Sequence, residues 1–173
     1  VRERRALNTV LAVAILVRIL AIVVLFFGSD HTQIVSFFWD GDGVFIKRRA
    51  LTILNVWNDV PVHQFDFTQA YDPYGWSTYL YVLAYLQYLA GPAPYALHLF
   101  NVALFVTAAV VLYRFSRTAY GSSPALLGLA ILLFLPTLIS WSVAALKESL
   151  YVLLCATTVV AAVAAIRNRT VTG

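Results

Sequence analysis

Two pairs of charged residues in this chain have the types and spacing that could do chemistry beside a membrane. Asp40 and Asp42, separated by one glycine, follow the first long apolar run. A carboxylate there could take a proton from an acceptor hydroxyl or hold a divalent cation on a phosphate. Lys147 and Glu148 interrupt a later apolar stretch. A lysine at that point suits a phosphate, and a glutamate suits a metal ion or a sugar hydroxyl.

Each pair also has a structural interpretation. Asp42 is a good N-cap for a helix that follows it, and Asp40 beside a glycine is typical of a turn. Lys147 and Glu148 could form the solvated tip between two helices. Charges next to so much apolar sequence are costly unless they lie at an interface, are paired or are used. The functional interpretation therefore depends on whether both pairs lie on the same side of the membrane.

The composition places the chain in a bilayer. It is 61% hydrophobic with a mean hydropathy of +0.81, above the roughly 45–50% of soluble domains. Basic residues are not interleaved with aromatic ones outside the apolar segments, so nucleic acid is not an expected partner. The sequence predicts an all-α, polytopic integral membrane protein with a single membrane domain over 1–173. Its predicted spans are 7–27, 95–113, 124–141 and 150–166.

The distribution of arginines orients these spans. The aromatic segment 76–90 is shorter than the roughly 20 residues of a span, and its rings favour the membrane interface. If it does not cross, the three arginine clusters that flank the spans fall on one side, which the positive-inside rule makes cytoplasmic. Both termini are then cytoplasmic, and 28–94 is a long extracytoplasmic loop that shares its side with Lys147 and Glu148. The clusters are Arg2, Arg4 and Arg5; Arg114 and Arg117; Arg167 and Arg169.

The long outer loop is expected to be ordered in part. Residues 44–57 have the spacing of an amphipathic interfacial helix. Its predicted apolar face carries Ile46, Ala50, Ile53, Leu54 and Trp57, and its predicted polar face carries Arg48, Thr52 and Asn55. The run Lys47, Arg48, Arg49 would face anionic lipid or a lipid-linked phosphate, or alternatively solvent and headgroups. Residues 58–75 are expected to form an ordered loop.

Several residues inside the apolar segments are expected to be structural. Arg18, in the middle of the first span, should face the bundle interior and a partner; Asn101, Thr107, Thr157 and Thr158 are the candidates. Cys155 is expected to be a small core residue, and Pro136 to kink its helix.

His31, His63 and His98 lack the spacing of a metal cluster. The chain has no methionine and begins with Val1, so a piece of a longer protein is expected.

Four stretches together resemble the GT-C superfamily of membrane glycosyltransferases, close to the protein O-mannosyltransferase and aminoarabinose-transferase type. They are Trp-Asp-Gly-Asp-Gly-Val-Phe at 39–45, Asp-Pro-Tyr-Gly-Trp at 72–76, His-Leu-Phe-Asn at 98–101, and 135–150 with its Lys-Glu pair. Segment 72–76 lacks the double proline common in that family, and the chain has fewer spans than its members.

The resemblance implies an inverting-type enzyme in the cell (plasma or inner) membrane. Such an enzyme moves a hexosyl or pentosyl group from a polyprenyl-phosphate donor to an extracytoplasmic glycan, lipid or protein. The catalytic acid of the family's first outer loop corresponds to Asp40 or Asp42. Lys147 and Glu148 correspond to substrate-contacting residues of its second outer loop, and Arg48 or Arg49 would assist at the donor phosphate.

Some members of that superfamily need a divalent metal and others do not. If this chain needs one, Mg²⁺ or Mn²⁺ would be held by Asp42 and Glu148. Two other classes remain open from the sequence. One is a non-enzymatic membrane assembly subunit with the outer loop as its docking surface. The other is a fragment of a transporter or flippase in which Arg18 is the functional charge.

Overall fold

A computed structural model describes residues 2–27, 42–71, 78–91, 93–144 and 146–171. Within these ranges every regular element is an α-helix, and there are eight of them. Three helices are long and apolar enough to cross a membrane, and a bent pair makes a fourth candidate span. The chain is an all-α, multi-pass membrane protein, as the composition predicted.

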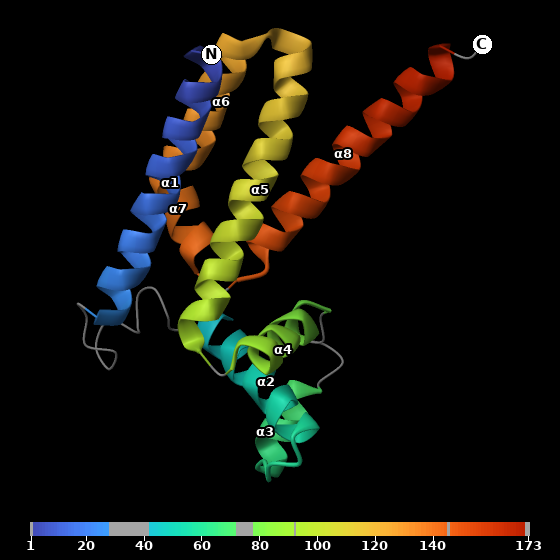
Figure 1. The fold of residues 1–173 in the computed structure, drawn as a ribbon. Coiled ribbons are helices and arrows are strands. Elements are labelled where there is room, and N and C mark those ends of the chain that lie inside the picture. Colours follow the sequence, from blue (N-terminus) through green and yellow to red (C-terminus); the bar gives the residue numbers. More distant parts are fainter. Residues whose placement is uncertain (1, 28–41, 72–77, 92, 145, 172–173) are drawn as a thin grey trace.

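The four candidate spans run alternately up and down (Figure 1). They are α1 (Arg2–Phe27), α5 (Pro94–Tyr120), the pair α6 (Ser122–Phe134) and α7 (Pro136–Val143), and α8 (Glu148–Val171). The start of α1, the turn between α5 and α6, and the end of α8 lie at one end of the molecule, which we name the arginine end. Each predicted span overlaps one of these, although α5 and α8 extend well beyond their predicted limits.

Three shorter helices lie at the opposite end, which we name the site end (Figure 1). They are α2 (Asp42–Trp57), α3 (Gln64–Ala70) and α4 (Thr78–Ala90). Helix α4 is not among the candidate spans, in agreement with the expectation for 76–90. The short α3 lies where only a loop was predicted. Its N-cap is His63, whose Nδ1 accepts the Phe65 N–H at 3.2 Å.

Helix α2 is packed more completely than an interfacial helix would be. Ala50, Ile53 and Leu54 are buried as predicted, but Thr52, predicted to face away, is buried too. Its hydroxyl donates to the Arg48 carbonyl at 3.0 Å, which satisfies it inside the helix. The reason is that α2 packs against both α3 and α4, which together cover more of its circumference than one apolar face.

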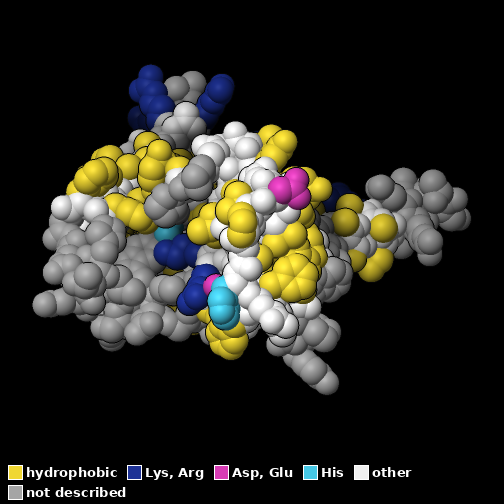
Figure 2. All heavy atoms as spheres, turned by 90° about the horizontal axis from the view of Figure 1, so that it is seen from below, with side chains coloured by type: hydrophobic (Ala, Val, Ile, Leu, Met, Phe, Trp, Pro, Cys, Tyr) yellow, Lys and Arg dark blue, Asp and Glu magenta, His cyan; other side chains and the backbone are white. Residues whose placement is uncertain are grey.

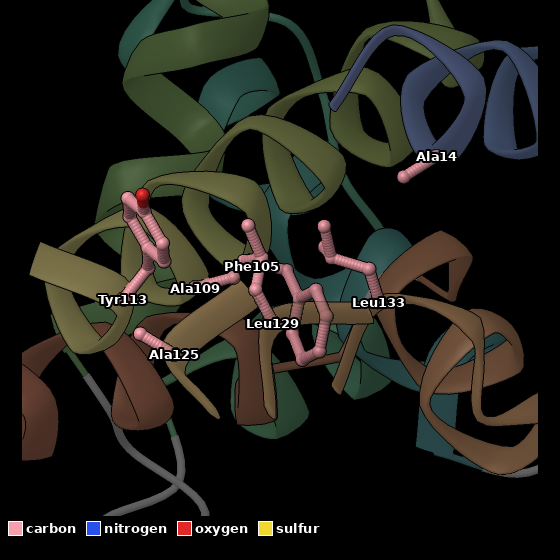
Figure 3. Packing of buried hydrophobic residues seen from close by; sticks show 7 residues of the cluster. All are labelled: Ala14, Phe105, Ala109, Tyr113, Ala125, Leu129 and Leu133. Atoms are coloured by element: carbon pink, nitrogen blue, oxygen red, sulfur yellow. The ribbon is translucent and has the colours of Figure 1, made fainter. Parts of the chain in front are cut away.

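The membrane bundle has its main apolar core between α1, α5 and α6 (Figure 3). Ala14, Ala109 and Ala125, one from each helix, are almost fully buried, and small residues of this kind let helices approach closely. Phe105 and Leu129 fill the space beside them. At the arginine end α1 and α5 are joined by Glu3. It accepts from the Tyr113 hydroxyl at 2.8 Å and pairs with Arg117 at 2.7 Å.

The span formed by α6 and α7 is broken at Leu135, where the two helices are bent by 61° relative to each other. Pro136 begins α7, so the predicted kink is present. A proline has no N–H to donate and a break exposes carbonyls, which in a membrane need another donor. That donor is Arg18.

Arg18 is completely buried and makes three hydrogen bonds. Its Nε donates to Ser142 Oγ at 2.7 Å, its Nη2 to the Leu133 carbonyl at 3.0 Å, and its Nη1 to the Ala14 carbonyl at 3.1 Å. The guanidinium also lies 5.2 Å from the Phe105 ring centroid. The interior location was predicted correctly, but the partners are a serine and carbonyls beside the helix break rather than Asn101 or the threonines.

Helix α8 leaves the bundle along its length. Ala156 is buried, whereas residues 157–167 are half-buried or exposed. The prediction that Cys155 is a core residue is therefore wrong, since Cys155 is exposed. Sequence hydropathy indicates that a helix is in the membrane, but it does not tell which of its faces meets lipid.

Candidate functional site

The candidate site lies where α2, α4 and α5 meet the connection between α7 and α8. A Cβ added at Gly43 would lie 3.9 Å from Leu146 Cδ2, so the start of α2 is in contact range of that connection. Beneath it, Ala50, Tyr79 and Leu97 pack in one apolar cluster with Leu150 at the side. Four separate elements are thus held together at this point.

Asn101 anchors the connection from inside the bundle. Its Nδ2 donates to the carbonyls of Ala144 and, at 2.9 Å, of Leu146. Its Oδ1 accepts from the Tyr79 hydroxyl at 3.0 Å. The connection after Val143 is not helical, so its carbonyls need donors from elsewhere. One buried amide of α5 therefore fixes both the path of the chain before Lys147 and the position of α4.

His98 makes the matching contact one turn earlier in α5. Its Nδ1 donates to the Val143 carbonyl at 2.6 Å, and its ring stands edge-on to Phe26 with centroids 5.3 Å apart. His98 is fully buried. The contacts agree with the expected structural role of this histidine. They also link the end of α1 to the site.

Lys47 is the cation of α2 that lies near this polar cluster, and its charge acts on the His98 ring. Desolvation by burial lowers the pKa of Lys47 below its ordinary value of 10.5. Lys47 belongs to the predicted basic run but was not among the predicted site residues. The signal was present: Lys47 lies three residues before Ala50 and seven before Leu54, at the edge of the buried face.

Glu148 is the first residue of α8, where a negative charge is favoured by the helix dipole. Its Oε2 is buried, and no described residue donates a hydrogen bond to that atom. The pKa of the Tyr79 phenol is raised, mainly by burial. The hydrogen bond to Asn101 opposes this shift, and the charge of Glu148 adds to it. A buried carboxylate oxygen of this kind is suited to accept a hydrogen bond from a ligand hydroxyl.

Lys147 is exposed beside Glu148, with its Nζ 6.0 Å from the Tyr151 ring centroid. Asp40 lies outside the described residues. Asp42 begins α2, and its side chain is also outside them. The backbone alone therefore shows that the start of α2 and the Lys147–Glu148 pair share the site end.

The other two predicted donor-phosphate residues hold α3 against α2. Arg48 pairs with Asp66 at 2.7 Å, although most of its side chain remains exposed. Arg49 is buried, donates to the Ala70 carbonyl at 3.5 Å and lies 5.1 Å from the Phe45 ring centroid. Figure 2 views the site end and shows basic, acidic and histidine side chains close together between apolar ones.

A divalent metal would need ligands beyond those that are described. No three His, Cys, Asp or Glu residues converge within the described part of the chain. Glu148 is the one predicted metal ligand whose side chain is described there. The described residues therefore do not form a metal site, and the Mg²⁺ or Mn²⁺ site at Asp42 and Glu148 stays a prediction.

An apolar groove of about 240 Å³ lies between α1 and α7, beside the site. Ala21, Val24 and Leu25 of α1 form one wall, and α7 forms the other up to Val143 and Ala144. The carbonyls of those last two residues accept from His98 and Asn101. The groove thus joins lipid-facing surface to the polar cluster.

No family model, curated protein or solved structure matches this chain.

Proposed function

We propose that this chain is part of a membrane glycosyltransferase that moves a hexosyl or pentosyl group from a polyprenyl-phosphate donor to an extracytoplasmic acceptor. One observation carries the proposal. The start of α2, whose first residue is Asp42, lies against the connection that bears Lys147 and Glu148. The first residue of α2, Asp42, and the Lys147–Glu148 pair, far apart in sequence, therefore lie at one end of the bundle, which supports the proposal.

The proposed transfer is a single displacement. The acceptor oxygen attacks the anomeric carbon, the bond from that carbon to the phosphate oxygen breaks, and polyprenyl phosphate leaves with the bonding electrons. Asp40 or Asp42 accepts the proton of the acceptor hydroxyl, and Glu148 positions that hydroxyl through its buried oxygen. The remaining aspartate would complete the contacts to the acceptor.

The donor phosphate would be met by lysines rather than by Arg49. Lys147 is exposed beside Glu148, and Lys47 lies near His98 on the other side of the connection. A phosphate there would accept charge-assisted hydrogen bonds from both lysines. Arg49 is buried against α3, which favours a structural role, and Arg48 remains a more exposed second contact.

The groove between α1 and α7 supports a lipid-linked donor. Among the described residues that line it, Ser140 is polar and the others are apolar. A polyprenyl chain bound there would bring its phosphate to the polar cluster at Val143 and Ala144 without leaving the membrane.

The test is turnover in membranes that contain the full protein, with a panel of short-chain polyprenyl-phosphate hexoses and pentoses. We expect Glu148→Gln and Asp42→Asn each to lower turnover by roughly 100-fold or more while expression is kept. Asp59→Asn is the matched control, because Asp59 is an exposed acid after α2 at the same end. Unchanged turnover in both variants would exclude this site, and no release of polyprenyl phosphate from any donor would exclude the function.

A non-enzymatic assembly subunit is favoured by a different observation. The site end carries exposed apolar and aromatic side chains: Phe65, Phe67, Tyr85, Tyr88 and Leu89. Such a surface suits a membrane interface or a protein partner. Phe65→Ser with Phe67→Ser would remove a partner from purified complexes if docking is the role, whereas turnover of an enzyme would be kept. The transporter alternative is weakened, because Arg18 is fully engaged in joining helices.

A further inference from the structure

Helix α4 is held against the first two turns of a candidate membrane span. Tyr79 and Leu83 of α4 are buried in one cluster with Leu97 of α5, and the Tyr79 hydroxyl donates to Asn101 at 3.0 Å. The candidate span in α5 starts at Tyr95, so Asn101 lies about 9 Å further along the helix axis. These contacts therefore place α4 at the end of a span, where the hydrocarbon core of a bilayer gives way to the headgroups.

The length of α4 does not allow it to cross the membrane itself. Its 13 residues cover about 20 Å of helix, which is less than the roughly 30 Å of the hydrocarbon core. Figure 1 shows α4 beside the start of α5 and oblique to it, rather than continuing the bundle. A short helix at this depth can meet lipid along one face only.

The exposed face of α4 is aromatic and uncharged. Tyr85, Tyr88 and Leu89 are 59%, 60% and 81% exposed, and α4 contains no charged residue. Trp57 of α2 adds to this face, because its ring centroid lies 4.7 Å from that of Tyr85. A helix face in contact with water normally carries charged residues. Tyrosine and tryptophan, which combine an apolar ring with a polar tip, are instead enriched where membrane meets water.

The charged residues described at the site end lie on other elements. Arg48 of α2 pairs with Asp66 of α3 at 2.7 Å, and the exposed Asp59 lies in the turn between those two helices. The charge-bearing part of the layer is therefore distinct from the exposed face of α4. This separation is expected if one part faces water and the other faces lipid.

We propose that the face of α4 formed by Tyr85, Tyr88 and Leu89 is inserted into the lipid interface at the site end. The surface is continuous along the chain with that of a span, because Leu89 is followed closely by Tyr95, which is 53% exposed where the span in α5 starts. The rings and Leu89 would lie among the first acyl carbons, and the tyrosine hydroxyls among the headgroups.

This contact adds a face and a depth to the expectation that the rings of 76–90 favour the interface. It also fixes the height of the polar cluster, because the buried face of the same helix carries Tyr79, which holds Asn101. Asn101 in turn holds the connection before Lys147. The lipid contact does not depend on the proposed enzyme activity.

The test is the accessibility of nitroxide spin labels in the full protein, reconstituted in vesicles of phosphatidylcholine. In a Cys155→Ala background, a label on Tyr88→Cys is relaxed either by oxygen, which dissolves in lipid, or by the water-soluble complex NiEDDA. Asp59→Cys is the water reference, and Leu16→Cys, at an exposed position within the span α1, is the lipid reference. We expect the ratio of oxygen to NiEDDA relaxation at position 88 to be several-fold higher than at position 59 and lower than at position 16.

Two results would overturn the proposal. A ratio at position 88 equal to that at position 59 would place the face of α4 in water. Weak relaxation by both reagents would show that a partner protein or a second copy of the chain covers the face instead of lipid. Leu89→Cys provides a second label site on the same face, and its 81% exposure means that the substitution removes little packing if Tyr88→Cys fails to fold.

Discussion

Arg18 shows how a serine and backbone carbonyls can accommodate a charged residue within a span. Its three hydrogen bonds go to a serine and two carbonyls, one of them beside the break at Leu135. The break exposes carbonyls that lipid cannot satisfy, and the guanidinium supplies the donors. The same hydrogen bonds thus offset both the cost of burying the charge and the cost of breaking the helix.

We therefore expect Arg18→Ala to lower the free energy of unfolding by roughly 2–4 kcal/mol, from lost charge-assisted hydrogen bonds and an unfilled space. Unfolding in detergent micelles with increasing sodium dodecyl sulfate measures it. Arg4→Ala, an exposed arginine of the same helix, should change stability little. A difference below about 0.5 kcal/mol between the two variants would contradict the bridging role.

Tyr79 provides a prediction about pH. Burial, the largest cause, raises the pKa of its phenol above the ordinary value of 10.0. The folded state therefore holds the proton more tightly than the unfolded state. The stabilisation is fully present below about pH 10 and is lost as pH rises from there through the folded pKa. We expect the melting temperature of the wild type to fall above pH 10, and Tyr79→Phe to flatten that part of the curve.

The Tyr79→Phe variant has a second readout at neutral pH. It also loses the hydroxyl donor to Asn101, which should cost about 1 kcal/mol at pH 7. Tyr88→Phe, at an exposed tyrosine of the same helix, is the control. An alkaline slope that is unchanged in Tyr79→Phe would contradict the assignment.

At the scale of elements, α2 to α4 form a packed layer at the site end rather than a set of loops. Ile53 of α2, with Leu80 and Ala84 of α4, is buried in one cluster that also includes Ala70 of α3. Trp57 lies over Tyr85, with ring centroids 4.7 Å apart. This layer sets the position of Lys47 relative to α5, so its packing controls the site.

We expect Ile53→Ala to destabilise this layer by roughly 2–4 kcal/mol, because it leaves a cavity among completely buried side chains. Limited proteolysis of the protein in detergent, followed over time, reports cleavage between residues 42 and 90. Leu51→Ala is the matched control, since Leu51 lies on the same helix and is 39% exposed. Equal cleavage rates in both variants would argue that α2 is not held by this cluster.

At the scale of the whole molecule, the candidate spans run between the site end and the arginine end, so we expect these two ends to lie on opposite faces of the membrane. In a Cys155→Ala background, single cysteines at Asp59 and Lys147 should react with an impermeant thiol reagent in intact cells. A cysteine at Ser123, in the turn that begins α6, should not. All three positions are exposed, so burial does not limit labelling.

Opposite labelling of Asp59 and Lys147 would show that the two ends are not arranged as four alternating spans. It would also separate the Asp40–Asp42 motif from Glu148 and thereby exclude the proposed site. Labelling of all three positions would place the turn between α5 and α6 outside the cytoplasm, against the positive-inside rule.

The sequence by itself determined the membrane class, the candidate spans and the kink at Pro136, because hydropathy, length and proline chemistry are local properties of the chain. Arginine clusters likewise predicted the alternation that Figure 1 displays. The tertiary structure alone decided how buried polar groups are paired. Whether Arg18 meets Ser142, or Asn101 meets the carbonyls before Lys147, depends on which faces of distant helices come together. The same reason explains why Lys47 and the exposure of Cys155 were missed: a period of 3.6 residues defines faces, but packing decides what each face meets.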